Sequence, residues 1–171
     1  FYNLLEQDIT DCVRDILNMG HDVGLHFEDT YYDIDSIEAL ESRLGFEKQF
    51  LQKIFDVEIR VFSFHNPNRF ALGCENWQYA GMINTYASYF KTDVSYCSDS
   101  DGYWRNRRLE DVLRVADDRC LQILTHPGWW QDTPMAPFER LKRCVRGRAD
   151  YTVRYYQELM TGLSRPYIEQ D

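Results

Sequence analysis

Hydrophobic residues in this chain recur at helical spacing in four segments. In the first, Ile9, Cys12, Val13, Ile16 and Leu17 are followed by Gly20, which stands where a C-terminal cap belongs. The second has Asp35 or Ser36 as a possible N-cap and its stripe at Ile37, Leu40, Leu44, Leu51 and Ile54. A short helix is predicted over 109–115, and a long final helix over 138–163.

Short apolar runs lie between these helices and predict strands. The clearest are Val23–His26, Arg60–Phe64, Val94–Cys97 and Leu121–Thr125, with a further short strand around Met82–Ile83. Helices that alternate with strands indicate a mainly parallel sheet covered by helices outside. We therefore expect an α/β domain, and the pattern shows no boundary of a second domain.

Three of the four histidines close a predicted strand. They are His26, His65 and His126. Side chains at the carboxyl ends of parallel strands converge on one face, which is where α/β proteins bind ligands. The sequence therefore predicts a metal site or an acid/base site built from histidines that are far apart along the chain.

Composition narrows the class of protein. The chain has 171 residues, 44% hydrophobic and 15% aromatic, which is typical of a folded domain with a real core. Its formal net charge of −9 argues against general binding of nucleic acid. Two basic clusters, at 105–108 and 140–148, stand out locally, and the second favours a solvated helix face. No apolar run is long enough to span a bilayer.

The five cysteines are odd in number and lack CxxC spacing, which favours free thiols in a reducing, cytoplasmic compartment.

Several residues near the strand ends could carry chemistry. Glu28 lies two residues after His26 and would share its side of an extended strand, so the two make half of a divalent-metal site. Asp99 follows the third run and could orient a catalytic histidine, bind substrate hydroxyls or coordinate metal. His126 suits acid/base work, and Trp129 and Trp130 suit a wall that stacks against sugars. No nucleophile elbow, P-loop, dinucleotide fingerprint or HExxH motif is present.

Four motifs in register resemble the polysaccharide deacetylases of the NodB-homology (carbohydrate esterase 4) group. They are GHDVGLH at 20–26, SFHNP at 63–67, SDSDGYW at 98–104 and ILTHPGWW at 123–130. The match is closer to a divergent branch found among surface-polysaccharide biosynthesis genes, and it covers nearly the whole chain in order.

This resemblance implies a distorted (β/α) barrel and a single catalytic domain over 1–171. It implies metal-dependent removal of acetyl groups from a sugar or polysaccharide precursor, with a divalent metal, zinc for preference. His26 would be a metal ligand and His126 the general acid that protonates the leaving group. Asp99, Trp104, Trp129 and Trp130 are expected to bind the carbohydrate.

The chain departs from the family pattern at three places. Thr30 stands where the family's second motif has another histidine, and His65 stands where its third motif has arginine. From position alone, His65 or Glu28 could replace the missing ligand. The family's first motif, an aspartate-bearing strand, would precede Phe1. We therefore expect a truncated barrel, and a fragment that lacks activity as it stands.

Two other functions remain open at this point. The chain could be a non-catalytic carbohydrate-binding protein that keeps the aromatic loops, or an amide hydrolase that acts on a substrate other than a sugar.

Overall fold

The computed structural model describes residues 6–104 and 106–163. The chain divides into two compact units, 1–95 and 96–171, and each is described by itself. The assignment of 1–171 to one catalytic domain stays a prediction.

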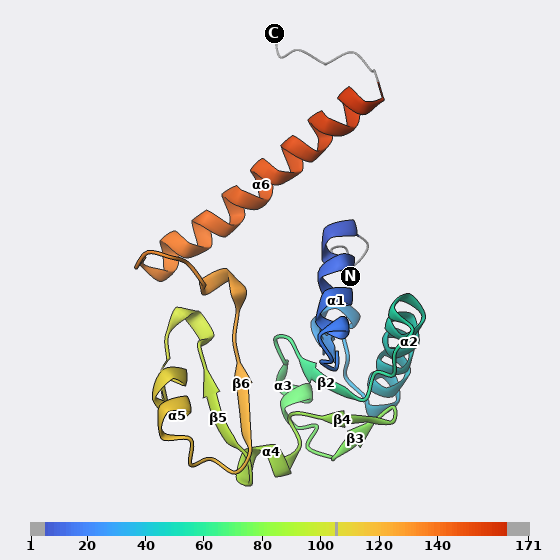
Figure 1. Cartoon of the computed structure of the whole chain (residues 1–171). Coiled ribbons are helices and arrows are strands. Elements are labelled where there is room, and N and C mark those ends of the chain that lie inside the picture. The colour runs from blue at the N-terminus through green and yellow to red at the C-terminus, as the bar shows by residue number, and fades with distance from the viewer. Residues whose placement is uncertain (1–5, 105, 164–171) are drawn as a thin grey trace. The chain divides into compact units, whose positions relative to one another are not determined.

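The first unit contains a mixed four-stranded sheet and its helices (Figure 1). Its helices are α1 (Gln7–Asn18), η2 (Asp29–Tyr32), α2 (Ile37–Phe55), α3 (Arg69–Leu72) and α4 (Ser88–Thr92). Its strands are β1 (Leu25–Phe27), β2 (Val61–Phe64), β3 (Gln78–Tyr79) and β4 (Met82–Asn84). The strand order is β1-β2-β4-β3, in which β1, β2 and β4 run parallel and β3 is antiparallel to β4.

Aromatic residues of the edge strand β1 and of its parallel neighbour β2 contribute to the core of this unit. Phe27, Phe62 and Phe64 are buried, whereas the alternate residues His26 and Ser63 face out of the core. Alternate residues of a strand point to opposite faces, so Phe62 and Phe64 share one face of β2 while Ser63 lies on the other. The helix α2 packs on the sheet through Leu40, Leu44 and Leu51, and the Ser36 hydroxyl caps it by accepting the Ala39 N–H at 3.3 Å.

Gly24 is needed where the chain enters β1. A Cβ atom at this position would lie 2.7 Å from Val61 Cγ1 and 3.0 Å from the Val61 carbonyl oxygen. The glycine therefore lets the neighbouring strand approach closely, as its place in the apolar run suggests.

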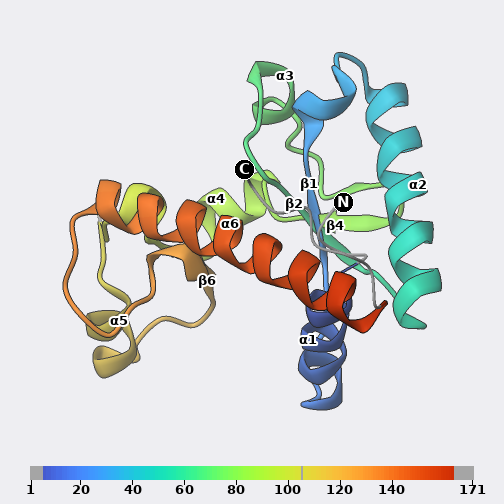
Figure 2. The ribbon, with the colours of Figure 1, turned by 90° about the horizontal axis from the view of Figure 1, so that it is seen from above.

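The second unit contains a two-stranded sheet and a long helix. Its elements are β5 (Ser95–Ser98), η3 (Ser100–Gly102), α5 (Leu109–Val115), β6 (Leu121–Leu124), η4 (Pro127–Trp129) and α6 (Pro137–Gly162). Figure 2 shows α6 as one continuous helix, and its bounds include Gly147. The predicted helices over 109–115 and 138–163 are confirmed to within a residue at each end.

The (β/α) barrel expected from the resemblance is wrong for this structure. The described strands form an open sheet of four and a separate sheet of two, and they do not close into a barrel. The alternation of strand and helix is interrupted between β3 and β4, which follow one another directly and form an antiparallel hairpin. Ala80 and Gly81 take its two central positions with φ of 47° and 68°, the backbone that a tight hairpin turn requires.

Within the described residues, no helix is both long enough and apolar enough to cross a membrane.

Candidate functional site

Asp99 and His126 lie directly beyond the ends of the two strands of the second unit. The Asp99 backbone N–H donates to the Leu124 carbonyl at 3.2 Å, so the two strand ends lie side by side. The Asp99 carboxylate accepts twice from His126, with Oδ1 2.6 Å from the ring Nδ1 and Oδ2 3.1 Å from the backbone nitrogen. The aspartate side chain is 6% exposed and the histidine side chain 44%.

This pairing assigns the proton of the neutral imidazole. A carboxylate can only accept, so the hydrogen bond places the proton of His126 on Nδ1 and leaves Nε2 as the nitrogen that exchanges protons. Of the three roles open for Asp99, the contacts fit the first, since the carboxylate orients the His126 ring. An imidazole held in this way can act as general base or general acid.

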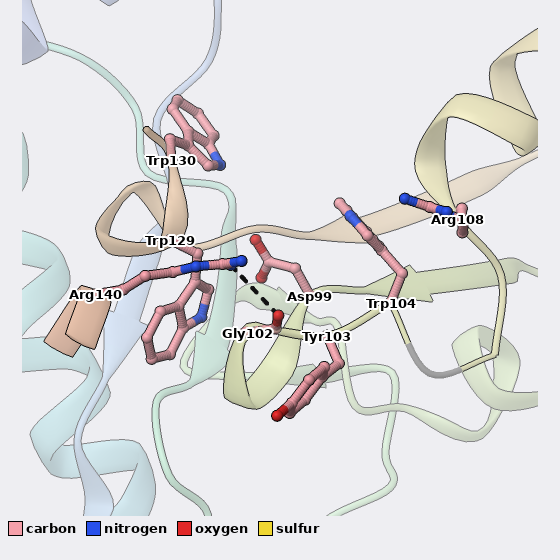
Figure 3. A pocket seen from close by; sticks show the side chains of 8 residues that line it. All are labelled: Asp99, Gly102, Tyr103, Trp104, Arg108, Trp129, Trp130 and Arg140. Carbon is pink, nitrogen blue, oxygen red and sulfur yellow. Dashed lines mark hydrogen bonds between the residues drawn. The ribbon is translucent and has the colours of Figure 1, made fainter. Parts of the chain in front are cut away.

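A pocket of about 440 Å³ opens beside this pair (Figure 3). Asp99 belongs to its lining, and His126 is joined to it through this carboxylate. The other lining residues come from the loop after β5, the start of α5, the loop after β6 and the first turn of α6: Gly102, Tyr103, Trp104, Arg108, Trp129, Trp130 and Arg140. All four residues predicted to bind substrate therefore line one pocket, and their role in binding stays a prediction.

A tight turn shapes one wall of the pocket. Gly102 has φ of 79°, and a Cβ atom there would lie 3.2 Å from the side chain of Pro137 and 3.7 Å from that of Trp129. Arg140 clamps this turn by donating from Nη1 to the Gly102 carbonyl at 3.4 Å and from Nε to the Met135 carbonyl at 2.8 Å. The Trp129 ring is thus packed against the turn.

His26 and His65 meet in the first unit. The parallel register pairs His26 with Ser63, and the His65 backbone N–H donates to the Phe27 carbonyl at 2.7 Å. The two ring centroids are 5.0 Å apart. The pairing of β1 with β2 therefore brings together two predicted metal ligands that lie 39 positions apart in the sequence.

Each of these imidazoles is held through its Nδ1 atom. His26 Nδ1 shares a hydrogen bond of 2.8 Å with Ser63 Oγ, and His65 Nδ1 lies 2.6 Å from Glu28 Oε2. The hydroxyl of Thr30 donates to the other Glu28 oxygen at 2.5 Å. The hydrogen bond from Thr30 has the largest effect and lowers the pKa of Glu28, burial opposes it, and the hydrogen bond with His65 lowers the pKa further. Thr30, which departs from the family pattern, thus supports Glu28.

These contacts test how well the residues fit a metal. A carboxylate behind a ligating histidine is common in metal sites, so Glu28 is placed to orient His65. Catalytic zinc has three protein ligands, and the described residues contain no group of three or more His, Cys, Asp or Glu side chains that could hold an ion. The described residues therefore offer a metal ion two imidazole ligands, and one carboxylate that orients His65.

The sequence motifs do not point to Arg108, Arg140 or Tyr103, although both arginines belong to the two basic clusters. The cluster at 140–148 was interpreted as a solvated helix face, and Arg140 departs from that interpretation because it lines the pocket. In the other cluster, the two terminal nitrogens of Arg107 bind both carboxylate oxygens of Asp118 at 2.8 and 2.7 Å.

No family model matches this chain, and no curated protein or solved structure is found to be similar to it. The resemblance to polysaccharide deacetylases therefore depends on its motifs alone.

Proposed function

We propose that this protein hydrolyses an acetyl group from a sugar or a polysaccharide precursor. The observation that carries the proposal is the pairing of His126 with Asp99 at the edge of a pocket lined by Trp104, Trp129 and Trp130. The pair supplies a proton-transfer group, and the indole faces suit the apolar face of a sugar ring.

In this reaction His126 moves the proton to the leaving group. Asp99 holds the ring and stabilises the imidazolium form, from which Nε2 donates a proton to the amine nitrogen or hydroxyl oxygen of the sugar. The bond between that atom and the acetyl carbon breaks. Water contributes the oxygen that ends in acetate, and its proton returns to Nε2, so that protons balance over the cycle.

The proposal includes a divalent metal ion at His26 and His65, with zinc as the preferred ion. Both rings lie close together, and Glu28 supports one of them. The described residues offer two of the three protein ligands usual for catalytic zinc, so we assign no step of the hydrolysis to a metal at this position.

The test is acetate release from N-acetylated and O-acetylated oligosaccharides, measured with and without added zinc. We expect His126→Gln to lower the rate about 10²- to 10⁴-fold, because general acid/base catalysis contributes that much. His21→Ala, at an exposed histidine outside both sites, should leave the rate unchanged. Equal rates for His126→Gln and the parent chain would exclude His126 from the reaction.

The same experiment separates the enzyme from a carbohydrate-binding protein. The protein is a binding protein if it binds these oligosaccharides through Trp130 and releases no acetate. Its affinity should then be unchanged by His126→Gln. Trp130 suits this comparison because it lines the pocket yet is 59% exposed, so that Trp130→Ala removes a stacking face with little effect on the core.

A further inference from the structure

The pocket beside Asp99 carries two guanidinium groups that have no ion pair among the described residues. Arg108 is exposed and directly precedes α5. Arg140 lies in the first turn of α6, where it donates to two backbone carbonyls, those of Met135 and Gly102. Carbonyl oxygens hold a guanidinium in place without cancelling its charge. Arg107 contrasts with both, since its charge is balanced by Asp118.

Among the described residues, one carboxylate lines the pocket, and it does not neutralise these arginines. Both oxygens of Asp99 accept hydrogen bonds from His126, at 2.6 Å and 3.1 Å. Even counted in full, the single negative charge of Asp99 is smaller than the two positive charges of Arg108 and Arg140. The pocket is thus locally positive in a chain whose formal net charge is −9.

A third donor faces the same region. The indole Nε1 of Trp129 is buried and has no hydrogen-bond partner among the described residues. A buried N–H without an acceptor is unfavourable, so an acceptor atom from a ligand would be favourable there. Figure 3 shows Arg140 beside the Trp129 ring and Arg108 beyond Trp104, so donors stand on both sides of the Asp99 carboxylate.

We propose that the sugar bound in this pocket is anionic, and that Arg108 and Arg140 bind its phosphate or carboxylate group. This inference rests on the proposed function and names the substrate class of the same site. Guanidinium groups pair with the oxygens of phosphates and carboxylates in a planar, two-point geometry that a neutral hydroxyl cannot match. The indole rings then cover the sugar while the arginines hold the charged group.

Titration calorimetry on the full chain tests the substrate class. Three ligands are compared: N-acetylglucosamine, N-acetylglucosamine 1-phosphate and N-acetylglucosaminuronic acid. We expect at least one charged sugar to bind about tenfold more tightly than the neutral one, the order of a charge-assisted hydrogen bond. The charged ligand that gains affinity identifies the group as phosphate or carboxylate, and 0.5 M salt should reduce the gain.

Variants assign the preference to the two arginines. Arg108→Ala and Arg140→Ala should each lose most of the gain, while Arg154→Ala, an exposed arginine further along α6, should keep it. Because Arg140 also clamps the turn at Gly102, Arg140→Lys serves as a second variant that retains the charge and should keep part of the gain. Equal affinity for charged and neutral sugars, or a preference that survives both alanine variants, would overturn the inference.

Acetate release, measured separately, distinguishes this inference from the proposed function. Tight binding of a charged sugar with no acetate release contradicts the hydrolase and supports the anion site. Equal acetate release from charged and neutral sugars, with equal affinities, contradicts the anion site and supports the hydrolase.

Discussion

Asp99 fixes His126 at two points, since one carboxylate oxygen accepts from the ring Nδ1 and the other from the backbone nitrogen of the same residue. The aspartate is nearly buried and follows β5, whereas the histidine follows β6 and is partly exposed. The pairing of these two short strands therefore positions both the ring and the main chain of the histidine. Such a histidine loses little entropy when it transfers a proton, because its orientation is already set.

Asp99→Asn should lower acetate release about 10²- to 10⁴-fold with little loss of sugar affinity. The amide can accept from only one of its two positions, so it cannot satisfy both His126 donors, and it cannot stabilise an imidazolium. The measurement is kcat and KM for acetate release, with Asp132→Asn as a control at an exposed aspartate. A rate unchanged in the Asp99 variant would show that the pair does not act in catalysis.

Zinc binding should depend on both histidines of the first unit. We expect His26→Ala and His65→Ala each to abolish zinc uptake in equilibrium dialysis, because a single imidazole is a weak ligand. Glu28→Gln should weaken zinc uptake by roughly 10- to 100-fold, because the carboxylate that orients the His65 ring is lost. His21→Ala provides the control. Zinc uptake that persists in a variant lacking both His26 and His65 would place the metal elsewhere.

Glu47→Gln should stabilise the chain at neutral pH. Glu47 is 5% exposed and accepts a hydrogen bond from the Tyr32 hydroxyl at 2.7 Å, and burial raises its pKa despite this bond. A carboxyl group whose pKa is raised in the folded state lowers the free energy of unfolding as the pH rises. The loss occurs between its ordinary pKa of 4.5 and the raised value.

The glutamine keeps an acceptor for Tyr32 and removes the buried charge. The melting temperature of the Glu47→Gln variant, followed by circular dichroism, should therefore exceed that of the parent chain. The difference should be larger at pH 7 than at pH 4. Glu58→Gln, at an exposed glutamate, should show no such pH dependence. A difference that is the same at both pH values would contradict the burial of a charged Glu47.

Gly24→Ala should destabilise the first unit by about 1–3 kcal/mol, the usual cost of overpacking a tight contact. Its new Cβ would lie 2.7 Å from Val61 Cγ1 and 3.0 Å from the Val61 carbonyl oxygen. Gly45→Ala on α2 is the matched control, because nothing lies within 4 Å of a Cβ there and alanine favours a helix by about 1 kcal/mol over glycine. Urea unfolding measures both, and two changes of the same sign would contradict this account of Gly24.

Local pattern was enough to place most of the elements. The stripe from Ile37 to Ile54 predicts α2, and the alternation of Phe62 and Phe64 with Ser63 and His65 predicts the two faces of β2. These features depend on residues close together in sequence, since helix and strand periodicity is a local property. The turn at Ala80–Gly81 was not predicted, because alanine is rarely found with positive φ. The hairpin that interrupts the alternation of strand and helix therefore lacked the usual turn signature.

The sequence by itself determined the four longest helices, most of the strands and the set of polar and aromatic residues that follow the strand ends. Only the tertiary structure decided how these residues pair: Asp99 with His126, His65 with Glu28, and Arg140 with the turn at Gly102. It also decided that the strands form two open sheets in place of a barrel. Pairing between distant segments depends on strand register and loop geometry, and neither is encoded in the periodicity of a single segment.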